Sequence, residues 1–99
     1  MSTIFGAGLS DVIFSSNEDT MVFSRDGDDF IDTGDGDDTI KAGGAQDTVF
    51  GGSGNDIIEG QAGNDILYGD AGNDTVKGGV GNDTVFGGAG SDDLAGGTG

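Results

Sequence analysis

Aspartate recurs every nine residues along most of this chain. When the sequence is written in blocks of nine from Gly6, the sixth position of the ten complete blocks is aspartate nine times, and Thr20 is the exception. The chain contains no cysteine and no histidine, so the ligands that zinc, copper and haem prefer are missing. Oxygen ligands remain, and these suit hard cations such as calcium. The residue types therefore point to the binding of a hard cation.

Each block also carries the signals of one turn followed by one short strand. Position eight is a branched aliphatic residue in all ten blocks, and positions one, two and four are rich in glycine. Glycine permits positive φ and brings carbonyl oxygens close to a ligand, and asparagine at position five also tolerates left-handed geometry. Positions seven to nine alternate out, in, out, whereas a helix would need apolar residues three and four apart. Such a unit cannot bury its one aliphatic side chain alone, so it must stack on copies of itself.

Residues 51–59, GGSGNDIIE, fit the nine-residue pattern G-G-x-G-x-D-x-U-x at every position. On this pattern the chain resembles the RTX (repeat-in-toxin) family, a module shared by secreted haemolysins, proteases, lipases and epimerases. The resemblance is close over about 24–99, and over 6–23 it is limited to the strand positions. It implies an all-β fold, a right-handed parallel β-roll (a β-solenoid) with two nonapeptide repeats per turn. Calcium would lie between loops eighteen residues apart.

The resemblance also implies which atoms hold the metal. The carboxylates would be those of Asp29, Asp38, Asp47, Asp56, Asp65, Asp74, Asp83 and Asp92. The carbonyl oxygens would be those of Gly34, Gly36, Gly52, Gly54, Gly60, Gly63, Gly69, Gly72, Gly79, Gly81, Gly88 and Gly90. About six Ca²⁺ ions would offset most of the net charge of −16. The pairs with intact loops on both sides are expected to be the best sites: Asp56/Asp74, Asp65/Asp83 and Asp74/Asp92.

Two segments are expected on the same basis. Residues 1–23 are interpreted as degenerate N-terminal capping repeats that keep the strands but lose the metal, because Thr20 replaces an aspartate and Leu9 replaces a loop glycine. Residues 24–99 are interpreted as calcium-binding nonapeptide repeats, truncated mid-repeat at GGTG. Since only 32% of the residues are hydrophobic and the aspartates repel one another, the module is expected to fold on binding calcium. The family implies a secreted, extracellular protein (a toxin, a hydrolase or another exported protein) that leaves the cell by type I secretion.

Composition excludes several other functions. Three basic residues cannot neutralise a phosphate backbone against 19 acidic ones, so the chain is not a nucleic-acid binder. No stretch approaches the ~20 apolar residues of a membrane helix, so membrane insertion by this segment is not expected. No nucleophile–base set is visible. The chain is therefore interpreted as a non-catalytic module, and any catalytic domain would lie outside it.

One alternative is a structural or surface-adhesive, ice-binding β-solenoid that needs no calcium. Threonine does recur at position seven, as in Thr48 and Thr84, but Ile57 and Ile66 interrupt the two columns. A disordered linker would have no reason to keep ten aliphatic residues in phase.

The two outer faces of the roll are expected to differ. One carries Phe50, Tyr68 and Phe86 at eighteen-residue spacing, and the other carries Lys41, Glu59 and Lys77. The aromatic column either stabilises neighbouring strands by cross-strand contacts or docks on a partner domain or a second copy of the chain. The sequence leaves both open.

Overall fold

The computed structural model describes residues 2–6, 8–15 and 17–97, which form eleven β-strands and no helix. Six strands form one sheet: β1 (Ser2–Phe5), β3 (Thr20–Phe23), β5 (Thr39–Gly43), β7 (Ile57–Ala62), β9 (Thr75–Val80) and β11 (Asp93–Ala95). Five strands form the other: β2 (Val12–Phe14), β4 (Phe30–Asp32), β6 (Thr48–Phe50), β8 (Ile66–Tyr68) and β10 (Thr84–Phe86). This part of the chain holds no helix long and apolar enough to cross a membrane.

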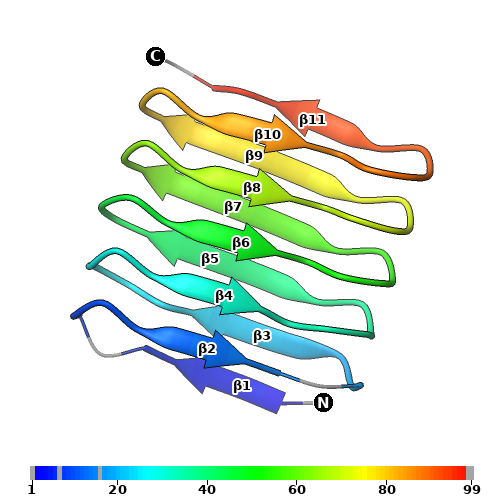
Figure 1. Cartoon of the computed structure of the whole chain (residues 1–99), viewed down its shortest axis with the longest axis horizontal. Coiled ribbons are helices and arrows are strands. Elements are labelled where there is room, and N and C mark those ends of the chain that lie inside the picture. The colour runs from blue at the N-terminus through cyan, green and yellow to red at the C-terminus, as the bar shows by residue number, and fades with distance from the viewer. Residues whose placement is uncertain (1, 7, 16, 98–99) are drawn as a thin grey trace.

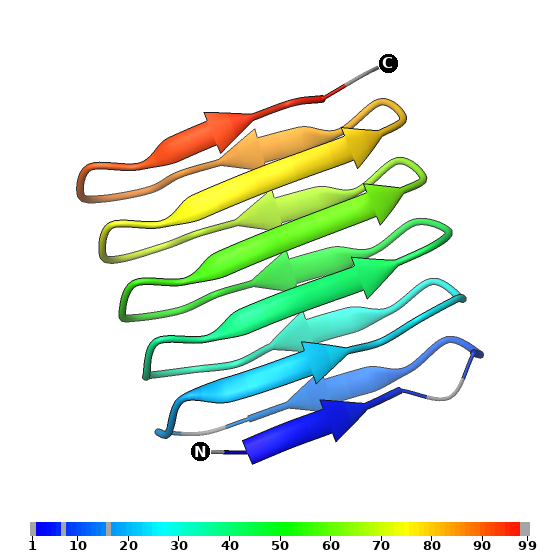
Figure 2. The same ribbon diagram turned by 180° about the vertical axis from the view of Figure 1, so that it is seen from behind.

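The chain alternates between the two sheets, so each strand pairs in parallel with the strand two further along (Figure 1). Val49 pairs with Leu67 on one sheet and Ile58 with Val76 on the other, eighteen residues apart in both cases. Seen from behind, the odd-numbered strands lie in front and run opposite to the even-numbered ones (Figure 2). The path rises as a right-handed coil of two nonapeptides per turn, which confirms the predicted β-roll.

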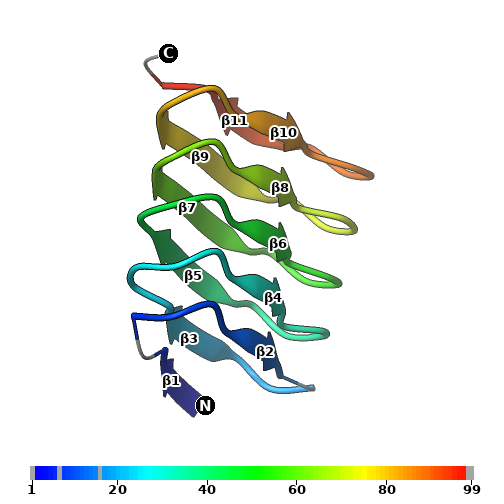
Figure 3. The same ribbon diagram turned by 60° about the vertical axis from the view of Figure 1, so that its left-hand side comes forward.

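The two sheets face each other, as the turned view in Figure 3 shows, and the core between them is one layer of aliphatic side chains. The position-eight residues Ile13, Val22, Ile31, Ile40, Val49, Ile58, Leu67 and Val76 are buried, and Val85 packs against them partly buried. The strands from β2 to β10 alternate outward and inward as predicted, for example intermediate, buried, intermediate over β6, whereas β11 is exposed throughout. Because each repeat supplies one such residue, the core exists only through stacking.

Glycine supplies left-handed backbone at positions two and four of the loops. Gly52 has φ 82° and Gly54 has φ 116°, and the non-glycine residues Gln61 and Asp70 adopt φ 75° and 70° at position two. Among the described residues, positions one and five do not have positive φ. The expectation that glycine at position one and asparagine at position five serve this geometry was therefore wrong.

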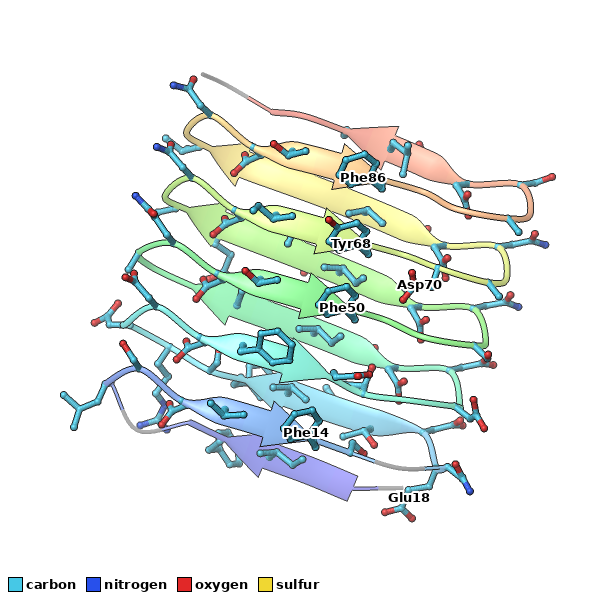
Figure 4. The ribbon with its side chains drawn as sticks, viewed as in Figure 1. Phe14, Glu18, Phe50, Tyr68, Asp70 and Phe86 are labelled. Atoms are coloured by element: carbon cyan, nitrogen blue, oxygen red, sulfur yellow. The ribbon has the colours of Figure 1, made fainter. Side chains whose placement is uncertain are left out.

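The aromatic column on the outer face of the five-stranded sheet is longer than the sequence indicated. Phe50 stacks on Tyr68 with ring centroids 4.7 Å apart, and Tyr68 stacks on Phe86 at 4.9 Å (Figure 4). Phe30 extends it, with its ring 5.6 Å from Phe50 and 5.9 Å from Phe14. Five rings therefore form one continuous ladder across all five strands.

Candidate metal centre

The position-six aspartates lie in two columns, one along each edge of the roll. Each one directly precedes a strand: Asp56 comes before β7, and Asp65 comes before β8. Their side chains turn inward beneath the loops rather than out to solvent. Only 1–3% of the surface of these six residues is exposed: Asp29, Asp38, Asp47, Asp56, Asp65 and Asp74.

One carboxylate oxygen of each aspartate ties its turn to the turn before it. The Asp38 N–H donates to Asp56 Oδ1 at 2.8 Å, and the Asp56 N–H donates in turn to Asp74 Oδ1 at 2.9 Å. The other edge repeats the arrangement, with Asp47 N–H donating to Asp65 Oδ1 at 2.9 Å. The register therefore brings together every pair of carboxylates eighteen residues apart that the sequence predicted.

Position five makes the opposite connection, which sequence reasoning missed. Asn55 Oδ1 accepts a hydrogen bond from Asn73 N–H at 2.9 Å, and Asn64 Oδ1 accepts one from Asn82 N–H at 2.8 Å. The acceptor here belongs to the earlier turn, whereas at position six it belongs to the later one. Asparagine recurs at position five because its amide oxygen accepts this bond without adding charge.

The second carboxylate oxygen has no hydrogen-bond partner. This holds for the buried Oδ2 atoms of Asp29, Asp38, Asp47, Asp56, Asp65, Asp74 and Asp83. From Asp56 to Asp83, Oδ2 lies next to the position-one glycine of its own repeat. A Cβ placed on Gly60 would be 2.5 Å from Asp65 Oδ2 and 2.8 Å from the carbonyl oxygen of Gly78 in the next turn. In these repeats glycine at position one leaves a space that is bordered by a bare carboxylate oxygen and a carbonyl oxygen.

A comparison with protein families identifies the repeat. The family model described as the RTX calcium-binding nonapeptide repeat (4 copies) matches residues 16–49, 23–58, 42–76, 50–85 and 68–99. The chain belongs to this family. Neither the comparison with curated proteins nor that with solved structures gives a significant match. RTX repeats are calcium-binding structural modules rather than catalytic ones, so the family supports a calcium-binding β-roll module.

Burial makes the charged carboxylates of these RTX repeats unfavourable. Loss of solvent raises the pKa of Asp56 to about 8, against the hydrogen bond from the Asp38 N–H that lowers it, and the like charges of Asp38 and Asp74 raise it further. Burial likewise raises the pKa of Asp47 to about 8 and that of Asp65 to about 6. It also raises the pKa values of Asp29, Asp38 and Asp74. A cation beside Oδ2 would favour the charged form and offset the repulsion along each column.

The donor atoms of the RTX loops fit calcium. Among the described residues no three acidic side chains converge on one point, so main-chain carbonyl oxygens must complete the coordination. The carbonyl oxygens of Gly36 and Gly54 face the loop of the following turn, whereas that of Gly78 faces Gly60 in the turn before it. Calcium takes six to eight oxygen ligands in variable geometry, whereas magnesium demands a strict octahedron. The predicted ligand set of eight aspartates and twelve glycine carbonyls stays a prediction.

Proposed function

We propose that this chain is a calcium-binding β-roll module that folds on binding calcium and belongs to an exported protein. The observation that supports it best is the series of buried Oδ2 atoms that have no hydrogen-bond partner. Each lies beside a position-one residue, and from Gly51 onward that residue is glycine. In the unfolded chain these oxygens would be solvated, so folding without metal is costly. Metal binding then contributes directly to folding.

The metal would be held between successive turns. Position-six carboxylates from two turns and glycine-loop carbonyls would supply the ligands, and bound calcium would supply positive charge to a buried, acidic edge. The register gives six carboxylate pairs from Asp29 to Asp92, so we expect several ions, at most about six. The two oxygens of each position-six aspartate would have different roles. Oδ1 accepts a hydrogen bond from the neighbouring turn, and Oδ2 is left to bind the cation.

Calcium-dependent folding would couple the module to its location. RTX proteins are typically exported, and extracellular modules bind calcium at ~10⁻⁴–10⁻³ M. A chain with this affinity would stay unfolded at intracellular calcium and fold outside the cell. An unfolded chain passes through a secretion channel more easily than a folded one, in keeping with type I secretion.

A calcium titration followed by circular dichroism tests the proposal. We expect a coil-like spectrum in chelator, a β-rich spectrum at millimolar calcium and a weaker response to magnesium at the same concentration. Calorimetry on the same samples counts the ions. A β-rich spectrum that persists in excess chelator would reject calcium-dependent folding and favour the calcium-independent, surface-adhesive solenoid instead.

A further inference from the structure

The residue at position one changes along the roll. It is Ser15, Ser24, Thr33 and Ala42 in four successive repeats, and it is glycine in every repeat from Gly51 onward. Position six, by contrast, stays aspartate from Asp29 to Asp92. The earlier and later turns therefore both carry an aspartate at position six but differ in the residue at position one.

In the earlier turns a hydroxyl group occupies this place. Thr33 Oγ1 donates to the carbonyl oxygen of Gly51 at 3.0 Å, and Ser24 Oγ donates to that of Ala42 at 2.5 Å. Both side chains are completely buried. Each hydroxyl thus bridges to position one of the next turn, eighteen residues on. In the repeat that lacks the aspartate, Ser15 Oγ instead bonds Thr20 Oγ1 at 2.7 Å.

In the later turns the equivalent carbonyl oxygen faces a glycine. A Cβ placed on Gly51 would be 3.1 Å from the Gly69 carbonyl oxygen and 2.7 Å from Asp56 Oδ2. This is the carbonyl that corresponds to the one bonded by Thr33 a turn earlier. Asp56 is 1% exposed, and its Oδ2 has no partner. A position-one side chain and a cation bound to Oδ2 would therefore compete for the same space and the same carbonyl oxygen.

We propose that the residue at position one decides whether an inter-turn site takes a cation. The inference rests on the proposed calcium function and says which of the six carboxylate pairs are filled. In the pairs Asp29/Asp47 and Asp38/Asp56, Ser24 and Thr33 engage the carbonyl oxygen that a cation would need, so these pairs stay empty although their Oδ2 atoms also have no partner. The Ala42 methyl group takes the same place in the next pair. The glycine-lined pairs bind calcium: Asp56/Asp74, Asp65/Asp83 and Asp74/Asp92. The earlier turns are linked by these bridges in place of metal, whereas the later turns depend on bound calcium.

Reciprocal substitutions test this assignment. Thr33→Gly should raise the number of bound calcium ions by about one, and Gly51→Ser should lower it by about one, because each converts one kind of turn into the other. Gly51 does not have positive φ, so serine is compatible with its backbone. Gly96→Ser is the matched control, since a Cβ at this position-one glycine meets nothing within 4 Å. It should leave the count unchanged.

Ion counts come from calorimetry with metal analysis, and circular dichroism in calcium checks the fold of each variant. If Gly51→Ser does not fold, Thr33→Gly alone decides. Hydrogen exchange in chelator, with sulfate added to populate the folded state, gives an independent readout: amides of β3 and β5 in the native chain should exchange more slowly than those of β8 and β10. Unchanged ion counts in a calcium-binding chain, or uniform exchange, would overturn the role of position one and leave the proposed function intact. A native chain that binds no calcium would overturn both.

Discussion

Replacing Asp56 with asparagine should stabilise the metal-free roll and weaken its binding of calcium. Asp56 Oδ1 accepts the Asp38 N–H at 2.8 Å, and an asparagine amide oxygen can keep this bond. Oδ2 is buried and has no partner, so its charge is unfavourable until a cation binds. The substitution removes that charge with almost no change of shape. Its two effects therefore have opposite signs, and calcium decides which is seen.

The size of the metal-free effect follows from the pKa of Asp56. Burial raises this pKa from 3.8 to about 8. At neutral pH the metal-free protein must take up a proton at Asp56 when it folds, which costs up to about 4 kcal/mol at ~1.4 kcal/mol per pKa unit. We expect Asp56→Asn to recover a large part of this, on the order of 2–4 kcal/mol in chelator.

The assay is urea unfolding followed by circular dichroism, in chelator with sulfate added to populate the folded state and again in saturating calcium. Asp37→Asn is the control, because Asp37 is exposed and its Oδ1 accepts the Asn55 N–H at 2.8 Å as an asparagine would. It should leave both stabilities nearly unchanged. The reasoning is refuted if Asp56→Asn destabilises the chain in chelator, or if its calcium midpoint equals that of the native chain.

Three further predictions concern the same structure. Burial raises the pKa values of Asp47 and Asp56 to about 8, so the folded metal-free chain binds more protons than the unfolded chain between pH 3.8 and pH 8. Circular dichroism in chelator should therefore show that the metal-free fold is most stable below about pH 4 and loses this contribution as the pH rises through 8. Asp74→Ala should lower the calcium count in calorimetry by about two ions, since Asp74 is paired through hydrogen bonds with both Asp56 and Asp92, whereas Thr20→Ala should leave it unchanged. Replacing Phe50, Tyr68 and Phe86 with threonine should lower the free energy of unfolding in calcium by about 0.5–1.5 kcal/mol for each pair of stacked rings that is removed; a shift from dimer to monomer in sedimentation would instead assign the ladder to docking.

Periodicity predicted most of the fold from the sequence. One aliphatic residue in every nine predicts which side chain turns inward, whereas the pairing of residues eighteen apart, such as Val49 and Leu67, was implied by the family resemblance. The carboxylate columns followed from the same register. The aliphatic residue recurs in all ten blocks and the aspartate in nine, so Thr20 removes one carboxylate from its column without changing the register.

The sequence did not predict the contacts that individual side chains make within each repeat. Glycine at position one leaves space beside the carboxylate, whereas glycine at position two adopts positive φ, and the residue type alone cannot separate these two roles. Asparagine at position five was misread because its side chain can either tolerate left-handed backbone or accept a hydrogen bond. The Phe30 ring joins the ladder diagonally, although Asp32 is the register partner of Phe50. Such a contact depends on side-chain rotamers that a nine-residue pattern does not specify.

The difference between the two outer faces determines how a roll of this kind can change length. Losing a single nonapeptide, such as residues 51–59, would leave the remaining repeats in phase but would move every later strand to the opposite sheet. Tyr68 would then follow the column of Lys41, and its stack on Phe50, at 4.7 Å, would disappear. Losing two nonapeptides together restores both columns. The unit that can be gained or lost without mixing the two faces is therefore the full turn of eighteen residues. Such a module can grow or shrink by duplication or deletion of two nonapeptides at a time.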